Sequence, residues 1–324
     1  MPRVFVYEHV TATGLGRDPS SAEHSLFVEG RAMLSAVSAD FAAVPGVEVL
    51  TLPAGVSPSD HADTFARLAA SADWSLVIAP ETGGVLERLA REVLAAGGRL
   101  LGPKPTDIRA AADKDLLGRV WRRHGVPTPR TVMASSYRKR PPVYGPHLGD
   151  GWPGVVCKPR DGCGSEGVYL IQTPDELAAL PRDPKRLLQQ FVPGQPVSVA
   201  FLCGVGRVVP LLPTVQHLST DGRFRYLGGS LPTPPDLAER AVALGRKAIQ
   251  SLPGLFGYVG VDLVLGERDV AIEINPRLTT SYVGLRAAAE TNLAGAMLDV
   301  AEGRTVEVRW RPGGVRWGAD GSIR

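Results

Sequence analysis

Two acids and an amide, spaced as in neighbouring β-strands, are the residues of this chain best suited to chemistry. Asp262 lies in an apolar run over residues 260–265, and Glu273 and Asn275 lie in a second run over residues 271–275. A short turn joins the runs, so they predict a hairpin, and alternation places Glu273 and Asn275 on one face. Asp262 on the partner strand can reach that face. Carboxylate and amide oxygens suit Mg²⁺ and its bound phosphates, so we predict a magnesium site rather than an ordinary hairpin with exposed acids.

Two basic residues are candidates for binding phosphate. Arg277 closely follows Asn275 and could clamp a transferring phosphoryl group. Lys158 ends a strand predicted over residues 155–158 and precedes a loop with three glycines, residues 161–167. An ammonium group and the backbone N–H groups of such a loop can hold nucleotide phosphates, and glycine allows the close approach. The loop alone is a weak signal, because glycine-rich turns are common and it matches neither the Walker A nor the Rossmann pattern.

Two weaker candidates lie on either side of that loop in the sequence. Lys114 begins a run with helical spacing, where a lysine is more often a solvated surface residue than a ligand. The extended segment over residues 188–195 could offer backbone groups to an adenine edge while Phe191 and Val192 pack. Taken singly, an ordinary structural role is the more common outcome for both.

Strands and helices alternate over residues 1–102. Residues with helical spacing separate strands that we predict at 3–7, 47–50, 74–79 and 99–102. This alternation is typical of a doubly wound parallel sheet. We therefore predict an α/β fold for this region.

After residue 102 the pattern becomes richer in strands. The expected elements are a helix over 107–124, a loop over 137–154, strands over 155–158 and 167–171, and a helix over 235–251. Another helix is expected to begin after Thr173, with Glu176 as its capping-box partner. This part of the chain is therefore predicted to be α+β.

Composition excludes several classes of protein. The chain has 324 residues, of which 44% are hydrophobic and 21% charged, with a formal net charge of +3. A folded globular protein with roughly two or three subdomains is expected, and the basic residues are too dispersed for a nucleic-acid surface. Neither a membrane span nor a signal peptide is predicted. The three cysteines lack a CxxC pair and predict neither disulfides nor zinc, so we expect a cytoplasmic location.

In this order, these features resemble the ATP-grasp superfamily over roughly residues 101–285. The resemblance implies ATP and Mg²⁺, with Mn²⁺ as an alternative metal. It implies nucleotide lysines at Lys114 and Lys158 and a phosphate arginine at Arg277. The implied metal ligands are Asp262, Glu273 and Asn275. The implied lid over the phosphates contains Gly162, Gly164, Ser165 and Gly167. The implied nucleotide-binding linker contains Gln189, Gln190, Phe191, Val192 and Gln195.

The chain departs from the family pattern at two positions. ATP-grasp proteins usually have a glutamate near Gln195, which binds the ribose hydroxyls, and another acid near Gln189. A glutamine can still hydrogen-bond a hydroxyl but lacks the charge. The resemblance therefore leaves nucleotide affinity and nucleotide choice open.

A closer resemblance is to the tyramine–glutamate ligase family of methanofuran and methylofuran biosynthesis. It rests on residues 29–33, 78–82 and 273–285, which lie toward both ends of the chain. It implies γ-glutamyl transfer onto the amine of tyramine or a related aromatic amine. Substrate-binding residues are expected around Glu81, Arg160, Gln216 and residues 279–282.

The resemblance to ATP-grasp proteins also implies how the chain divides. We expect an N-terminal α/β (pre-ATP-grasp) domain over residues 1–102 and a small ATP-grasp subdomain with the phosphate loop over 103–186. A C-terminal ATP-grasp subdomain with the metal site is expected over 187–310, followed by a tail over 311–324.

The implied reaction is the ATP-dependent, ADP-forming joining of a carboxylate to an amine. The carboxylate would attack the γ-phosphorus to give an acyl phosphate, and the amine would then displace phosphate. Lys158, Arg277 and the glycine-rich loop would neutralise the developing charge. The expected partners are therefore small carboxylate and amine substrates, without nucleic acid or membrane, and a homodimer is left open.

Two alternatives to this reaction stay open. Another ATP-grasp ligase or a kinase would share the metal site and differ only in its product. A non-catalytic nucleotide-binding protein is favoured by Gln189 and Gln195, whereas the intact set of lysines, acids and arginine argues against it.

Overall fold

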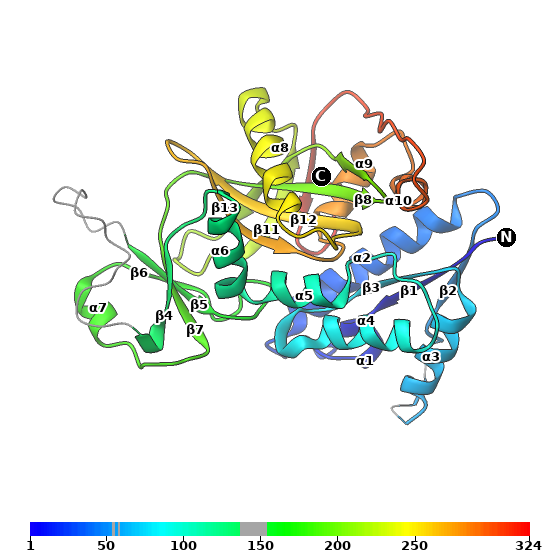
Figure 1. Cartoon of the computed structure of the whole chain (residues 1–324), viewed down its shortest axis with the longest axis horizontal. Helices are drawn as coiled ribbons and strands as arrows, with labels where there is room; N and C mark the ends of the chain where they lie inside the picture. The colour runs from blue at the N-terminus through cyan, green and yellow to red at the C-terminus, as the bar shows by residue number, and fades with distance from the viewer. Residues whose placement is uncertain (54–55, 58, 137–153) are drawn as a thin grey trace.

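The computed structural model describes residues 1–53, 56–57, 59–136 and 154–324, so all but the last residue of the expected loop over 137–154 lies outside the described residues. The described residues form a 3-stranded, a 4-stranded and a 7-stranded sheet. In Figure 1 the 4-stranded sheet lies at the left end, the N-terminal unit at the lower right, and the largest sheet above. No helix among the described residues is long and apolar enough to span a bilayer.

The N-terminal unit is built on a parallel sheet in the order β2-β1-β3. Its strands are β1 (Arg3–Glu8), β2 (Glu48–Thr51) and β3 (Trp74–Ile78). Val4 and Val6 of β1 pack in the same core as α2 (His24–Ala42), whereas Phe5 and Tyr7 pack in the core that contains α3 (His61–Ser71) and α4 (Val85–Ala95). Alternate residues of a strand point to opposite faces, so helices cover both faces of this sheet. The doubly wound parallel arrangement is confirmed.

The strand predicted over residues 99–102 is the exception in this unit. Only a single parallel bridge forms there, between Ser75 and Leu100. Pro103 follows the run almost at once and has no N–H group to donate to a ladder. Prediction of a full fourth strand was therefore wrong.

The helix predicted over residues 107–124 is two helices. α5 (Pro105–Ala112) and α6 (Lys114–Arg123) are separated at Asp113, whose ψ of 96° is extended. The Asp113 side chain accepts hydrogen bonds from the backbone N–H groups of Asp115 and Leu116, so it caps α6. The cap at Asp113 therefore divides a segment whose apolar spacing alone predicts one continuous helix.

The small antiparallel sheet has the order β4-β7-β5-β6. Its strands are β4 (Thr131–Met133), β5 (Val155–Pro159), β6 (Tyr169–Ile171) and β7 (Arg186–Gln190). Between β6 and β7 lies α7 (Pro174–Ala178), where Thr173 accepts a hydrogen bond from the Glu176 N–H at 3.2 Å. The helix start predicted at Thr173 is confirmed.

The largest sheet is antiparallel, with the order β13-β12-β8-β10-β11-β14 and β9 paired to β8. Its strands are β8 (Gln195–Gly204), β9 (Arg207–Pro210), β10 (Thr214–Leu218), β11 (Tyr226–Leu231), β12 (Gly257–Leu265), β13 (Val270–Asn275) and β14 (Val315–Gly318). Residues 197–203 of β8 are all buried, because α8 (Pro235–Gln250) packs on one face and α10 (Leu293–Ala301) on the other. The predicted hairpin is therefore an edge of a covered sheet. Residues 311–324, which we assigned to a tail, contain β14.

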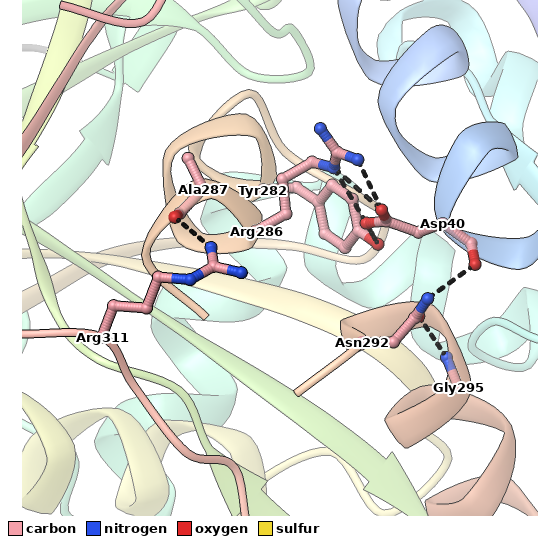
Figure 2. Close-up of polar contacts among 7 residues, drawn as sticks. All are labelled: Asp40, Tyr282, Arg286, Ala287, Asn292, Gly295 and Arg311. Atoms are coloured by element: carbon pink, nitrogen blue, oxygen red, sulfur yellow. Dashed lines mark hydrogen bonds and ion pairs between the residues drawn. The ribbon is translucent and has the colours of Figure 1, made fainter. Parts of the chain in front are cut away.

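A network of polar side chains joins the N-terminal unit to the largest sheet. Asp40 of α2 accepts a 2.6 Å hydrogen bond from the Tyr282 hydroxyl and a bidentate ion pair from Arg286, both on α9 (Ser281–Ala288). Figure 2 shows these groups meeting between the two helices, with Asn292 donating to the Asp40 carbonyl oxygen. One apolar core also runs through α2, β8, α9 and α10. The segment before α9 is thereby held beside the start of α2.

Candidate active site

A cavity of about 260 Å³ lies between the small antiparallel sheet, the largest sheet and α2 of the N-terminal unit. Its lining comes from the start of α2, the loop after β5, the end of β7, the strands β10 to β13 and the residues before α9. Every predicted site residue lines it except Gly167 and Gln195. The predicted residues in its wall are Lys114, Lys158, Gly162, Gly164, Ser165, Gln189, Gln190, Phe191, Val192, Asp262, Glu273, Asn275 and Arg277.

The predicted metal ligands meet on one face of the β12–β13 hairpin. Asp262 is the cross-strand partner of Glu273, and Gly260 is that of Asn275, so all three functional side chains share a face. Asn275 Nδ2 donates to Asp262 Oδ2 at 3.0 Å, and Gln216 Nε2 donates to Asp262 Oδ1 at 3.2 Å. The spacing read from the sequence thus brings the three groups together as expected.

The charges on this face suit a bound cation. Burial, and then the nearby Glu273, raise the pKa of Asp262 to about 7. Two facing carboxylates without a metal repel each other, and a divalent cation would relieve that repulsion. Among the described residues no group of three or more His, Cys, Asp or Glu side chains could hold a metal. The residues therefore fit Mg²⁺ only as two acids and an amide oxygen, with phosphate oxygens completing the shell.

Two lysines lie beside these acids. Lys158 of β5 is buried, with 4% of its surface exposed, and burial lowers its pKa to about 8 although Glu273 opposes the shift. Lys114 Nζ lies 3.4 Å from Glu273 Oε2 and donates to the Gly162 carbonyl oxygen at 2.7 Å. Despite burial, Lys114 and Lys158 together lower the pKa of Glu273. Lys114 is therefore not the solvated surface lysine that its spacing alone favoured.

The glycine-rich loop is anchored at several points. Asp161 Oδ2 accepts a 3.0 Å hydrogen bond from the Gly83 N–H of the N-terminal unit, and Ser165 Oγ donates to the Phe224 carbonyl oxygen at 2.8 Å. Ser165 has a φ of 60°, and a Cβ at Gly164 would lie 2.9 Å from Leu26 Cδ2 of α2. The loop thus lies over the cavity and contacts both neighbouring units.

The predicted adenine linker is the end of a strand. Gln189 and Gln190 belong to β7 and pair with β5, and Gln189 Nε2 donates to Thr131 Oγ1 at 3.0 Å. Phe191 follows and stacks on Phe224, with ring centroids 6.1 Å apart. Apolar side chains of Val156, Leu263 and Ile272 complete this end of the cavity. An apolar slot with a few polar groups is the usual setting for a planar ring.

Arg277 reaches from the end of β13 to the N-terminal unit. Its Nη2 donates to Glu81 Oε2 at 3.2 Å, and its Nε lies 2.9 Å from Glu81 Oε1. Burial opposes the charge, but Glu81 raises the pKa of Arg277. Glu81 lies outside the cavity wall and orients an arginine that lies within it.

Several residues named from the sequence have other surroundings. Gln195 is not in the wall, and its Nε2 donates to the Pro196 carbonyl oxygen. Arg160 forms a bidentate pair with Asp113, and Tyr282 is buried against Asp40. Arg160 and Tyr282 are thus not in the cavity wall, whereas Thr279, Thr280 and Ser281 of the expected segment 279–282 line it. Gln216, by contrast, lies in the wall, on strand β10 rather than in the loop that its polar neighbours suggested.

Other wall residues were missed by the sequence reasoning. The side chains of Glu29, Thr214, Phe224 and Tyr226 line the cavity, and Glu29 Oε2 accepts a 3.0 Å hydrogen bond from Thr280 Oγ1. Of these four residues, only Glu29 could have been found from the sequence, because it belongs to the segment 29–33 that resembles tyramine–glutamate ligases. The others carry ordinary residue types that the topology brings to the cavity.

Comparison with known proteins gives this geometry a family. The ATP-grasp domain family matches residues 111–281, and the pre ATP-grasp 3 domain family matches residues 34–108. The chain belongs to the ATP-grasp family. Its relationship extends to ADP-forming ligases that join carboxylates to amines, so the predicted enzyme class is confirmed.

Individual relatives support the same family. The chain is 29% identical over 226 residues to the tyramine–L-glutamate ligase of Methanocaldococcus fervens, covering 70% of this chain and 65% of that protein. It is 26% identical over 249 residues to the corresponding ligase of Methanocaldococcus jannaschii, covering 76% of this chain and 68% of that one. The match thus spans about two thirds of the length of these relatives.

A solved structure shows the same fold over nearly the whole chain. An ATP-grasp superfamily protein from Archaeoglobus fulgidus superposes with a TM-score of 0.68 and 24% identity, covering 98% of this chain and 92% of that one. The predicted ATP-grasp fold is therefore confirmed.

The cysteines do not form a reactive site. Burial raises the pKa of the Cys163 thiol, which lies in the cavity wall, and Cys157 is buried beneath Arg186. A thiolate is the nucleophilic form, so the environment of Cys163 does not favour nucleophilic catalysis.

Proposed function

We propose that this chain is an ATP-dependent ligase that joins a carboxylate to an amine through an acyl phosphate. The observation that carries the proposal is the convergence of Asp262, Glu273 and Asn275 with Lys158 and Arg277 in one cavity. Acids that suit a metal and cations that suit phosphates are the two requirements of phosphoryl transfer from ATP. The anchored glycine-rich loop adds backbone N–H groups and excludes water.

The residues have distinct proposed roles. Asp262, Glu273 and Asn275 would hold Mg²⁺, which supplies charge neutralisation to the β- and γ-phosphates when it is bound. Lys158 and Arg277 would bind the phosphoryl group as the substrate carboxylate attacks it. The amine then displaces phosphate to leave an amide bond. The apolar slot beside Phe191 would hold the adenine ring.

We further propose glutamate and tyramine, or a related aromatic amine, as the substrates, with a γ-glutamyl amide as the product. Similarity to the two tyramine–L-glutamate ligases supports this choice and a place in methylofuran-type cofactor biosynthesis. The aromatic side chain of Tyr226 in the same cavity is consistent with an aromatic acceptor.

The test is an assay of the purified protein with ATP, Mg²⁺ and a matrix of amino acids against amines. We expect ADP release that needs both substrates, together with the mass of the new amide. ADP release with a phosphorylated amino acid or amine would replace the ligase with a kinase. Binding of Mg-ATP without product from any pair would contradict the proposed substrates.

Glu273→Gln tests the metal site. We expect the turnover number to fall at least about a hundredfold, because a neutral amide cannot replace a buried carboxylate that faces a divalent cation. Glu267→Gln is the matched control, since Glu267 is exposed in the turn of the same hairpin. Full activity of a folded Glu273→Gln enzyme would remove this residue from the metal site.

A further inference from the structure

The acid Glu29 lines the cavity but has no part in the proposed nucleotide chemistry. Glu29 lies on the first turns of α2, in the N-terminal unit, and its carboxylate forms part of the cavity wall. Its Oε2 accepts the 3.0 Å hydrogen bond from Thr280 Oγ1, which fixes the direction of the side chain. The hairpin acids come from different elements, β12 and β13.

Glu29 has no ion-pair partner within the part of the chain that the structure describes. Arg277 is the cation that acts on it, but the guanidinium of Arg277 already pairs with Glu81. A half-buried carboxylate with one hydroxyl donor has lost water without gaining a compensating charge. Such a group is matched to a cation that arrives with a ligand.

The side chains around Glu29 indicate which class of cation its carboxylate would bind. The wall near it includes Tyr226, whose ionisation Glu29 opposes, and the hydroxyl groups of Thr279 and Thr280. The Tyr226 hydroxyl accepts a 2.9 Å hydrogen bond from Trp317 Nε1, so the ring is held in place. A fixed aromatic ring beside a carboxylate suits a small organic ammonium.

We propose that Glu29 binds the ammonium group of the amine substrate and so selects acceptors that carry an amine. This inference rests on the proposed ligase function and assigns its amine site to α2. The amine would then be bound from the N-terminal unit, whereas the adenine slot and the hairpin acids belong to other elements. Burial raises the pKa of Glu29 although Thr280 opposes the shift, and a bound ammonium would offset that burial.

The network at Asp40 supports the position of Glu29. Glu29, Met33, Val37 and Asp40 lie on neighbouring turns of α2, and Asp40 is tied to Tyr282 and Arg286 of α9. Thr280, the hydrogen-bond donor to Glu29, directly precedes α9. The two helices therefore hold the carboxylate and its donor in register.

The test is calorimetric titration of tyramine into protein saturated with Mg²⁺ and a non-hydrolysable ATP analogue, with 4-ethylphenol as the probe that lacks an ammonium group. We expect wild-type protein to bind tyramine at least tenfold more tightly than 4-ethylphenol. Glu29→Gln should weaken tyramine binding at least tenfold, and Glu29→Asp should weaken it less. Glu239→Gln, at an exposed position on α8, is the charge-matched control.

Affinity for the ATP analogue serves as the check on folding, and we expect it to be the same in all variants. Unchanged tyramine affinity in Glu29→Gln, or equal binding of tyramine and 4-ethylphenol by wild-type protein, would overturn the inference. The amide assay separates this failure from failure of the proposed function. Wild-type product with unchanged amine binding in Glu29→Gln removes only the role of Glu29, whereas absence of amide from every pair contradicts the proposed substrates on which this inference rests.

Discussion

Lys114, Lys158 and Arg277 surround the hairpin acids with cations from three different elements. Lys158 comes from β5, Arg277 follows β13, and Lys114 is the first residue of α6. Arg277 is paired with Glu81, whereas both lysines act on the same acid, Glu273. The lysines therefore bring positive charge that a triphosphate can use.

Lys114→Gln tests this excess of charge. We expect the Kd for Mg²⁺ with a non-hydrolysable ATP analogue to rise roughly 10- to 100-fold, because one charge-assisted contact contributes about 1.5–3 kcal/mol. The loss of its bond to the Gly162 carbonyl oxygen adds to the effect by loosening the loop. Calorimetric titration measures the change.

Arg119→Gln is the matched control for Lys114→Gln. Arg119 lies on the same helix, half exposed, and its ion pair with Asp115 is a surface contact. Equal affinities of wild-type protein and Lys114→Gln would show that Lys114 acts only on the loop.

For single residues, sequence reasoning fails where the environment of a side chain is formed by distant parts of the chain. Asp262, Glu273 and Asn275 could be placed together because strand alternation is a local rule. Lys114 could not be distinguished from a surface lysine, because its burial depends on a loop distant in the sequence. Gln195 was misplaced for a related reason, since its neighbours in sequence line the cavity and it does not.

The break between α5 and α6 is the element whose detail matters most for the site. Asp113 caps α6 and pairs with Arg160, while the Lys114 N–H donates to the Arg160 carbonyl oxygen at 3.0 Å. Arg160 is the residue from which the glycine-rich loop departs. The cap therefore fixes both Lys114 and one end of the loop.

Asp113→Ala is expected to lower the free energy of unfolding by about 1–2 kcal/mol, through loss of the cap and of the ion pair. Asp113→Asn should cost less than about 1 kcal/mol, because asparagine caps equally well and Arg160 is partly exposed. Urea denaturation at pH 7 measures both changes.

The cost of Asp113→Asn should also depend on pH. Although burial opposes the shift, Arg160 and the helix N–H groups lower the pKa of Asp113. A lowered folded-state pKa gives stability that is present above the unfolded value of about 3.9 and lost as the pH falls below it. The difference between wild type and Asp113→Asn should thus shrink toward pH 3. A difference that persists there would show that charge is not its source.

Elements were predicted well where apolar spacing alone defines them. The strands β1 to β3 and the β12–β13 hairpin follow from runs rich in apolar residues. The break at Asp113 was missed because the cap depends on a polar side chain inside an otherwise continuous pattern. The strand at 99–102 was overpredicted because it was assigned from apolar composition alone. Composition does not show whether ladder hydrogen bonds form, and the following proline has no N–H group to donate.

At the scale of the whole molecule, the N-terminal unit and the largest sheet share one apolar core and the polar network at Asp40. Tyr282 is fully buried, and its hydroxyl group has Asp40 as its acceptor. None of this was predictable from local patterns, because Asp40 and Tyr282 are far apart in the sequence. The polar network at Asp40 fixes the position of α2 relative to the cavity.

Tyr282→Phe is expected to lower the free energy of unfolding by about 1–3 kcal/mol, the usual effect of removing a buried hydrogen bond to a charged group. Urea denaturation followed by fluorescence measures it. Arg304→Gln is the control, since Arg304 pairs with Asp299 and Glu302 at an exposed site and should contribute less than about 1 kcal/mol. Equal stabilities of Tyr282→Phe and wild type would show that the Tyr282 hydroxyl does not hold the two units together.

The cavity wall is divided between parts of the chain that can change independently. The groups that suit ATP come from the strands and loop between residues 114 and 277, whereas Glu29 comes from a helix that precedes them all. If Glu29 binds the amine as proposed, substitutions at the start of α2 would alter the choice of acceptor during evolution while leaving phosphoryl transfer intact. An ancestor with this fold could therefore give rise to paralogues for new amines by drift at one helix. The same division makes α2 the natural segment to randomise when the enzyme is redirected in the laboratory.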